Sequence, residues 1–370
     1  MVLEDKAFQK AALQSFINRG DADRDVSVYP LAQAFPIEQV ESIENVYNII
    51  ETQLNVAASI TGFNSGSPIR NKGQGKQAMA KLTKIQDAYF LDENDLIRYN
   101  NPRSKDEQDQ IIDQTFINTN NLSEGVEKTK EFLRAQMAYT GKFEYNDPRT
   151  ETKISFELDR PKENDLVSAT EWGTEDATPI TDLLLAIEQY QKTNGNTKPE
   201  VINMNSKTLA KFKRSGQIKT ELYGDSRSPR LVRDSDFNQL LNEFGVPAIQ
   251  VDDSETAIEQ LDGTNKVYKH LPDGRVVLRA AVLGKTLSGP SVENNYGKGK
   301  FVEAVISQDP HTEKTIVGEV ALPVTQNING TVFLDVLNKE TKNELEDTSD
   351  GSDDRRDDLS GSGDLGTSEM

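Results

Sequence analysis

The chain has 370 residues, of which 35% are hydrophobic and 28% charged, and its formal net charge is −19 at pH 7. The sequence contains no cysteine, which excludes disulfide bonds and thiolate metal sites. It also lacks a run of about 18 apolar residues that could cross a membrane. This length suits two domains with their own cores plus extensions, and the acidic balance limits any nucleic-acid contact to a local, weak one.

Two segments near the N-terminus have different patterns. The spacing of four apolar residues predicts a helix that ends near residue 20, either docked on another surface or loosely packed. These residues are Leu3, Phe8, Ala12 and Phe16. Residues 37–54 fit the helical and the strand pattern in part, so their type stays open.

The stretch from Thr52 to Gln86 contains no acidic residue, which is unusual in a chain of charge −19. Its basic residues are Arg70, Lys72, Lys76, Lys81 and Lys84. The centre is rich in Gly, Ser and Asn, and the flanks at 54–60 and 79–85 suit two strands, so we predict a long hairpin with a flexible basic tip. Structureless loops of this length are uncommon unless they are functional, which favours a functional role over a plain surface loop.

The clearest helix is predicted over residues 122–139. One narrow apolar stripe runs along it, and charged residues fill the other faces, so the helix should lie across a surface with a wide charged side. The stripe consists of Val126, Thr129, Leu133 and Met137, and the charged residues are Glu127, Lys128, Lys130, Glu131 and Arg134. Gly141 is a good stop signal, and the alternating segment that follows predicts a half-buried strand that pairs beneath the helix.

An α/β unit follows the loop that contains Trp172, the only tryptophan. Pro179 opens a helix with an apolar face of Leu183, Leu184, Ile187 and Tyr190. Strands are predicted at 201–205, 247–251, 267–268 and 276–283. Further helices are predicted to start at the caps Ser206 and Asp234 or Ser235.

The C-terminal third returns to strands, at 301–307, 314–324 and 331–337. These strands need partners, and the strand at 153–158 is the obvious candidate, which would make the α/β unit an insertion in a domain built from both of its flanks. Residues 340–370 hold eleven acidic and three basic residues, a net charge of −8. A segment with so little to bury is predicted to be disordered.

No residue set has the pattern of an active site. His270 and His311 are far apart in the sequence, and without Cys or an H-E-x-x-H pattern a catalytic zinc site is not expected. The GQGK sequence that ends at Lys76 lacks the spacing of a phosphate loop, and the pair Asp252–Asp253 is of a kind that is usually solvated surface. We therefore predict no catalytic residue, no cofactor and no metal site.

Four stretches, taken in their order along the chain, resemble the lambda-like tailed-phage major capsid protein family (phage major capsid protein E). They are AQMAYTGKFEYND at 135–147, TEW at 170–172, VINMNSKTLAKFKRS at 201–215 and VLGKT at 282–286. The resemblance covers roughly residues 5–337. It implies an α+β fold, the tailed-phage major capsid protein fold, and no enzymatic activity.

The resemblance also implies a division of the chain. The parts would be an N-terminal arm at 1–51, an extended hairpin loop at 52–90, a peripheral domain at 91–175 and 300–338 with its spine helix at 122–139, an axial domain at 176–299 and a disordered acidic tail at 339–370.

A protein of this family would assemble with itself into hexamers and pentamers that form an icosahedral head shell around phage genomic DNA. The expected partners are further copies of the chain, a separate scaffold protein, a portal, an optional decoration protein and double-stranded DNA contacted weakly and without sequence preference, but no membrane. The expected location is the virion, after assembly in the host cell cytoplasm. In such a shell, the five basic residues of the acid-free stretch would contact neighbouring subunits.

Two alternatives stay open. A cellular nanocompartment shell would have the same fold but would package protein cargo, so only the particle contents separate it from a phage head. An α/β enzyme with its site in residues 176–299 belongs to a different class. The lack of a clustered nucleophile, base and metal ligands weighs against the enzyme.

Overall fold

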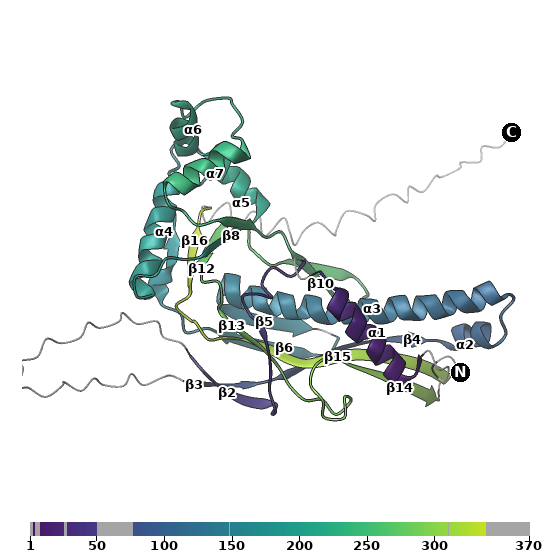
Figure 1. The fold of residues 1–370 in the computed structure, drawn as a ribbon. Coiled ribbons are helices and arrows are strands. Elements are labelled where there is room, and N and C mark those ends of the chain that lie inside the picture. The colour runs from purple at the N-terminus through teal and green to yellow at the C-terminus, as the bar shows by residue number, and fades with distance from the viewer. Residues whose placement is uncertain are drawn as a thin grey trace, which may run out of the picture.

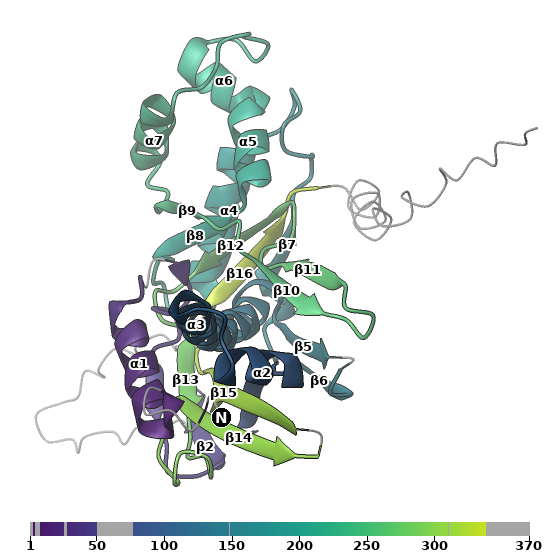
Figure 2. The same ribbon diagram turned by 90° about the vertical axis from the view of Figure 1, so that its right-hand side faces the viewer.

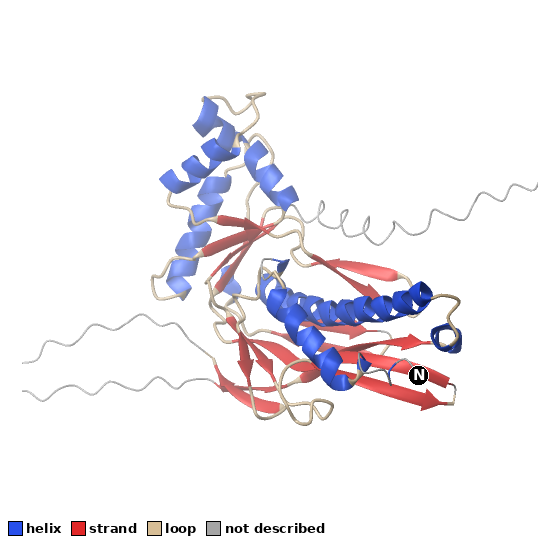
Figure 3. Cartoon of the chain, turned by 45° about the vertical axis from the view of Figure 1, so that its right-hand side comes forward, coloured by secondary structure: helices blue, strands red, loops and turns tan. Residues whose placement is uncertain are grey.

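A computed structural model gives the fold of the chain and describes residues 3, 8–25, 28–49, 77–147, 149–309 and 311–337. In Figure 1 a long helix, α3, lies along an extended sheet, and a smaller α/β part stands at one end of that helix. Figure 3 shows the helices of the smaller part standing on the side of its strands that is remote from α3. Within the described residues, none of the helices combines the length and apolar character that a membrane span requires.

The helical elements are α1 Lys10–Asp23, α2 Glu93–Asn100, α3 Lys105–Ala135, the π-helical turn η4 Gln136–Thr140, the 3₁₀ turn η5 Lys162–Asn164, α4 Pro179–Thr193, α5 Ser206–Arg214, α6 Gly216–Tyr223 and α7 Asp234–Glu243. The strands are β1 Ile37–Gln39, β2 Glu44–Asn48, β3 Gln77–Lys81, β4 Thr83–Leu91, β5 Lys142–Asp147, β6 Thr152–Glu157, β7 Asp165–Val167, β8 Val201–Met204, β9 Ile249–Val251, β10 Glu255–Glu259, β11 Asn265–Lys269, β12 Arg275–Arg279, β13 Gly284–Ser288, β14 Phe301–Gln308, β15 His311–Thr325 and β16 Thr331–Asp335.

The larger sheet is built around β15. This strand pairs antiparallel with β14 and β4 over its first part and with β13 over its last part, and β1 joins the edge parallel to β13. Nearly every residue in the second half of β15 is buried, because both faces of the sheet are covered there. The α3 helix supplies one of these covers and shares a core cluster with β13 and β15.

The α3 helix is much longer than the helix predicted at 122–139. It begins after Ser104, whose hydroxyl accepts a hydrogen bond from the backbone N–H of Glu107, and it runs for 31 residues before the π-helical turn η4. Gly141 then ends the helical segment in the left-handed region at φ 68°, as the sequence predicts. The polar residues 92–120 are predicted to form an approach helix leading into the long one, and the structure divides them between α2 and the first half of α3, which packs through a few side chains such as Phe116.

The smaller sheet has the order β7-β16-β12-β8-β9. It places β16 between β7 and β12, whereas β6 pairs with β5 in a separate hairpin. The predicted pairing of the last strands with the strand at 153–158 is therefore wrong. A short turn connects β5 to β6, so closing this local hairpin costs less chain entropy than a distant pairing.

Most of the predicted α/β unit is confirmed. Pro179 opens α4, which packs against the smaller sheet, although Leu184 is 40% exposed and does not belong to the buried face. Two helix caps differ from the prediction. Asn205, not Ser206, caps α5 by accepting a hydrogen bond from the Thr208 N–H at 2.8 Å, and Arg233 precedes the first residue of α7.

The predicted N-terminal stripe is only partly correct. Leu3 and Phe8 are buried, but the helix α1 starts later than expected, so it buries Leu13 and Ile17 and leaves Phe16 36% exposed. In Figure 2 α1 lies on one side of α3 and the β10–β11 hairpin on the other.

The open segment at 37–54 contains strands. Its β2 pairs antiparallel with β3, so the described part of the predicted hairpin is its base. The expected strand flank at 79–85 is divided between β3 and β4. The tip of the hairpin, its other flank at 54–60 and the acidic tail at 339–370 lie outside the described residues.

Candidate functional site

A groove of about 680 Å³ runs along one side of α3. Residues of α3, β4, the β5–β6 hairpin and the β10–β11 hairpin line it. Its apolar residues include Val126, Phe132, Leu133, Ile154 and Ile258. An apolar strip with a polar rim has the composition of a surface that contacts another polypeptide.

Arg149 links three of the elements that line this groove. One guanidinium nitrogen of Arg149 lies 2.7 Å from a carboxylate oxygen of Glu259 on β10, and another lies 3.9 Å from Asp87 on β4. All three side chains are at least one-third exposed, so each ion pair contributes only ~0–1 kcal/mol to stability. Weak ion pairs therefore join elements of the groove that are distant in sequence.

The structure places two of the five predicted contact residues. Lys81 is exposed at the end of β3, and Lys84 is the second residue of β4. The Lys84 ammonium forms an ion pair with Glu293 of the same chain and lies 5.3 Å from the centroid of the Phe301 ring. Arg70, Lys72 and Lys76 lie outside the described residues.

A buried ionic network lies beneath α3. The Lys130 ammonium lies 2.7 Å from Glu319 on β15 and 2.8 Å from Glu127, one turn earlier on α3. The Lys300 ammonium is 2.8 Å from Glu127 and 2.7 Å from Asp21 on α1. One network therefore joins the N-terminal helix, the long helix and the larger sheet.

The opposite charges in this network keep one another ionised. Burial alone would raise the pKa of Glu127, but the ammonium groups of Lys130 and Lys300 outweigh burial and hold this pKa at about 2. Burial would likewise lower the pKa of Lys130, yet the carboxylates of Glu319 and Glu127 raise it. Glu127 and Lys130 are therefore both charged at neutral pH, and the loss of either would leave a buried charge without its partner.

A second buried pair follows one turn later on α3. The Arg134 guanidinium lies 3.0 Å from Glu131 and donates a hydrogen bond to the Thr286 hydroxyl of β13. Glu131 also accepts a hydrogen bond from the backbone N–H of Leu31 at 2.7 Å. Burial raises the pKa of Glu131, and Arg134 opposes this effect. The pair anchors the segment before β1 to α3 and the larger sheet.

These findings overturn the prediction of a wide charged surface on α3. Lys130, Glu131 and Arg134 are each at most 2% exposed. The spacing of Glu127 to Lys130 and of Glu131 to Arg134 was a usable signal, because residues three apart on a helix can pair. Periodicity alone treats every charged residue as solvent-facing and therefore misses charges that are neutralised inside a fold.

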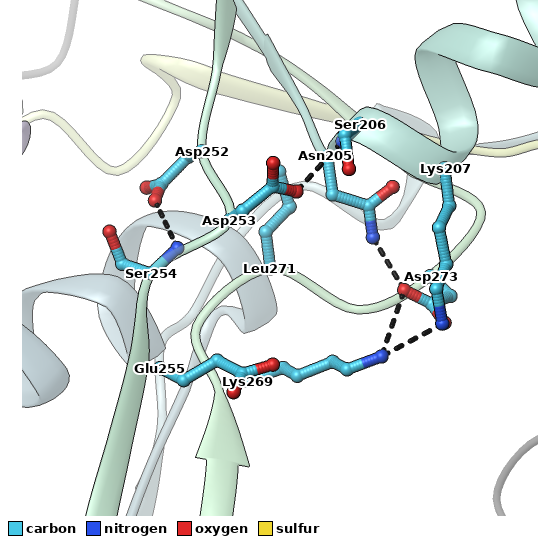
Figure 4. A pocket seen from close by; sticks show the side chains of 10 residues that line it. All are labelled: Asn205, Ser206, Lys207, Asp252, Asp253, Ser254, Glu255, Lys269, Leu271 and Asp273. Atoms are coloured by element: carbon cyan, nitrogen blue, oxygen red, sulfur yellow. Dashed lines mark hydrogen bonds and ion pairs between the residues drawn. The ribbon is translucent and has the colours of Figure 1, made fainter.

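Figure 4 shows a pocket where three loops of the α/β part meet. Asp273 accepts hydrogen bonds from Asn205 at 2.6 Å, from Lys269 and from Lys207. Asp253 accepts one from the Ser206 N–H at 2.8 Å, which supports the start of α5. The polar groups are thus engaged in joining the loops, and the pocket holds no paired nucleophile and base.

The histidines have different surroundings. His270 is buried behind the β10–β11 hairpin, whereas His311 is exposed at the start of β15. Across the described residues, no group of three or more His, Asp or Glu side chains is placed to hold a metal ion.

Comparison with known proteins gives consistent likenesses. The family described as "Phage major capsid protein E" matches residues 34–336. A prophage protein of E. coli CFT073, described as a capsid protein, has a similar structure with a TM-score of 0.55, 16% identity, and coverage of 89% of this chain and 99% of its own. A phage-related protein from Bordetella bronchiseptica RB50 has a TM-score of 0.52, 11% identity, and coverage of 87% of this chain and 96% of its own. A comparison with curated proteins finds no match.

Proposed function

We propose, from the premise that this chain belongs to the phage major capsid protein E family, that its copies assemble into the hexamers and pentamers of an icosahedral phage head shell. The protein is a capsid component with a structural role, and its fold is the tailed-phage capsid fold. The observation that carries the proposal is the family match over residues 34–336, a range that includes α3, the larger sheet and the smaller sheet.

We assign parts of the chain to roles in this shell. The arm at 1–51 and the hairpin loop at 52–90 would reach neighbouring subunits, and α3 would be the spine of the peripheral domain. The α/β part would be the axial domain near the centre of each capsomer. The mixed pairing of β16 with β12 and β7 argues that 331–335 belongs with this axial part.

The contents of the particle distinguish a phage head from a nanocompartment shell. We expect particles that package DNA to hold it weakly and without sequence preference, because the chain carries a net charge of −19. Particles from phage-producing cells would be treated with nuclease and then extracted. Protected double-stranded DNA of uniform length supports the proposal, and particles that hold only protein cargo contradict it.

The five basic residues of the acid-free stretch are proposed as contacts between subunits. Lys81 is exposed beside the base of the hairpin, and a positive hairpin tip would meet an acidic surface repeated on every neighbour. Charge complementarity speeds encounter and fixes the docking register, although each exposed pair contributes only ~0–1 kcal/mol. Because a shell repeats each contact many times, such small terms add up over the whole assembly.

Charge reversal of the hairpin tip tests this role. The triple variant Arg70→Glu, Lys72→Glu and Lys76→Glu should fold normally by circular dichroism but should fail to form shells at low salt in light scattering. Normal assembly of a folded triple variant would show that the charges of the hairpin serve only solvation.

A second triple variant separates position from net charge. Lys153, Lys162 and Lys198 are exposed lysines in other parts of the chain, and changing all three to Glu alters the net charge by the same amount. We expect this control variant to assemble. If both triple variants fail alike, the effect is one of overall repulsion and the hairpin has no special part.

We further propose that assembly takes place in the host cytoplasm and uses a separate scaffold protein and a portal, with a decoration protein as an optional outer partner. The mature location would be the virion. Mass spectrometry of particles isolated early and late in assembly would test this order, because a scaffold should be present early and absent from the finished head.

A further inference from the structure

His270 lies at the root of the β10–β11 hairpin, directly after the last residue of β11. Its ring is buried, with 5% of the residue exposed, and its backbone N–H donates a hydrogen bond to the Ser254 carbonyl at 3.0 Å. This bond joins the two ends of the hairpin at the point where it leaves the body. β10 and β11 pair with each other and, among the described residues, with no further strand.

Only one of the two ring nitrogens of His270 has a hydrogen-bond partner in the described part of the chain. Its Nε2 lies 2.7 Å from the hydroxyl of Thr256, a buried residue of β10. Its Nδ1 is also buried and has no hydrogen-bond partner in the part of the chain that the structure describes. A neutral imidazole tolerates this, because a bare nitrogen without a donor costs less than a buried N–H of an imidazolium without an acceptor.

A cluster of charged groups from three elements lies around Asp252, next to His270. Asp252, in the loop before β10, is the carboxylate that acts on the ring, and it is already engaged by the Tyr139 hydroxyl at 2.6 Å and the Ser254 N–H at 3.0 Å. On α3, Glu131 is paired with its arginine, and on β12 Arg279 donates to Asn203. The Asp252 and Glu131 carboxylates are therefore already engaged by other donors, and Arg279 offers no acceptor.

The hairpin packs against α3 through aromatic rings. The Phe132 ring lies 5.7 Å from that of Tyr268 and 5.9 Å from that of His270, measured between centroids. Thr256, Ile258 and their neighbours on β10 also line the groove along α3. We propose that His270 is an acid-sensitive lock: when its imidazole takes up a proton, the β10–β11 hairpin is released from α3 and the groove widens.

The direction of the pH dependence follows from burial. Burial lowers the pKa of His270, and the Asp252 carboxylate opposes this only in part. A histidine with a lowered pKa favours the closed hairpin fully above its ordinary pKa of about 6.5, and this stabilisation is lost as the pH falls below that value. The lock therefore operates in the mildly acidic range and is independent of whether the chain forms a phage head or another shell.

Hydrogen exchange of the full-length chain measures the lock directly. Amide protection in residues 255–269 would be compared at about pH 7.5 and about pH 5, after correction for the intrinsic pH dependence of exchange. We expect protection of the hairpin to fall by about threefold or more at the lower pH, while α3 stays protected. Equal corrected protection at both pH values would overturn the proposal.

The two histidines provide a matched pair of variants. In His270→Gln the hairpin should lose its pH dependence, because glutamine does not titrate, whereas His311→Gln should behave as the wild type. A His270→Gln protein that keeps the full acid effect would assign the effect to another group and overturn the proposal.

A titration of the wild-type protein covers the case in which His270→Gln does not fold. The ring proton signals of the two histidines can be followed by NMR from neutral to acid pH and assigned with His311→Gln. The signal of His270 should titrate below about pH 6.5, the ordinary value, together with the loss of hairpin protection. Titration at or above that value would contradict the lock.

Discussion

The Nζ atom of Lys130 lies 2.7 Å from a carboxylate oxygen of Glu319, and this buried contact joins the long helix α3 to the central strand β15. The Glu319 carboxylate also accepts a hydrogen bond from the Ser288 hydroxyl on β13 at 2.7 Å. Helix and sheet are therefore joined by an ionic contact in addition to apolar packing, and the contact depends on the presence of both charges.

Replacing Lys130 with Met should strongly destabilise the subunit. The change removes the ammonium and leaves the buried Glu319 carboxylate without a cation, which costs about 3–5 kcal/mol in comparable buried pairs. Urea unfolding of unassembled subunits, followed by circular dichroism, measures the loss. Lys128→Met is the control, because the Lys128 side chain is 53% exposed and, within the described part of the chain, forms an ion pair with Glu124 alone. Similar losses in the two variants would show that the buried network adds nothing.

The Glu127 carboxylate should make stability depend on pH in acid. Its pKa in the folded state is about 2, below the ordinary value of 4.5, so its contribution is complete above pH 4.5 and is lost as the pH falls toward 2. The shift corresponds to a stabilisation on the order of 3 kcal/mol. We expect Glu127→Gln to be less stable than the wild type at neutral pH and to approach it as the pH falls. A difference that stays constant with pH would refute this role.

Two glycines of the α3 region should respond to alanine in opposite ways. Gly141 has φ 68°, and a Cβ there would lie 3.0 Å from the Arg160 side chain, so Gly141→Ala should lower stability by about 1–2 kcal/mol. Gly125 lies within α3 with no atom within 4 Å of an added Cβ, so Gly125→Ala should raise stability by up to ~1 kcal/mol. Melting temperatures of both variants would decide, and shifts in the same direction would argue against the described end of the helix.

Removal of residues 339–370 should leave the melting temperature of the body unchanged. The segment 340–370 carries a net charge of −8, from eleven acidic and three basic residues, and has few apolar side chains to bury. A truncated protein that melts several degrees lower would show that the acidic segment packs on the body.

The sequence predicts local secondary structure better than the pairing of strands. The helix opened by Pro179 and the stop at Gly141 were correct, because each depends on the backbone preference of one residue. The partners of β16 could not be predicted, since alternation shows that a strand has a buried face but not which strand lies beside it.

At the candidate site too, local features could be predicted from the sequence, and contacts between distant segments could not. The acid-free composition around Lys81 could be noticed without a structure, but the groove along α3 is formed by elements far apart in the chain. The buried position of Glu131 and Arg134 was missed for a related reason. Whether a charge is buried depends on its partner, here the Thr286 hydroxyl and the Leu31 N–H in addition to the pair itself.

The most direct test of the account is electron microscopy of the purified, full-length protein after assembly with its natural partners. We expect closed shells in which this chain forms hexamers and pentamers, with α3 and both sheets recognisable in each subunit. A protein that stays monomeric or forms only small open oligomers under conditions in which the phage head matures would contradict it.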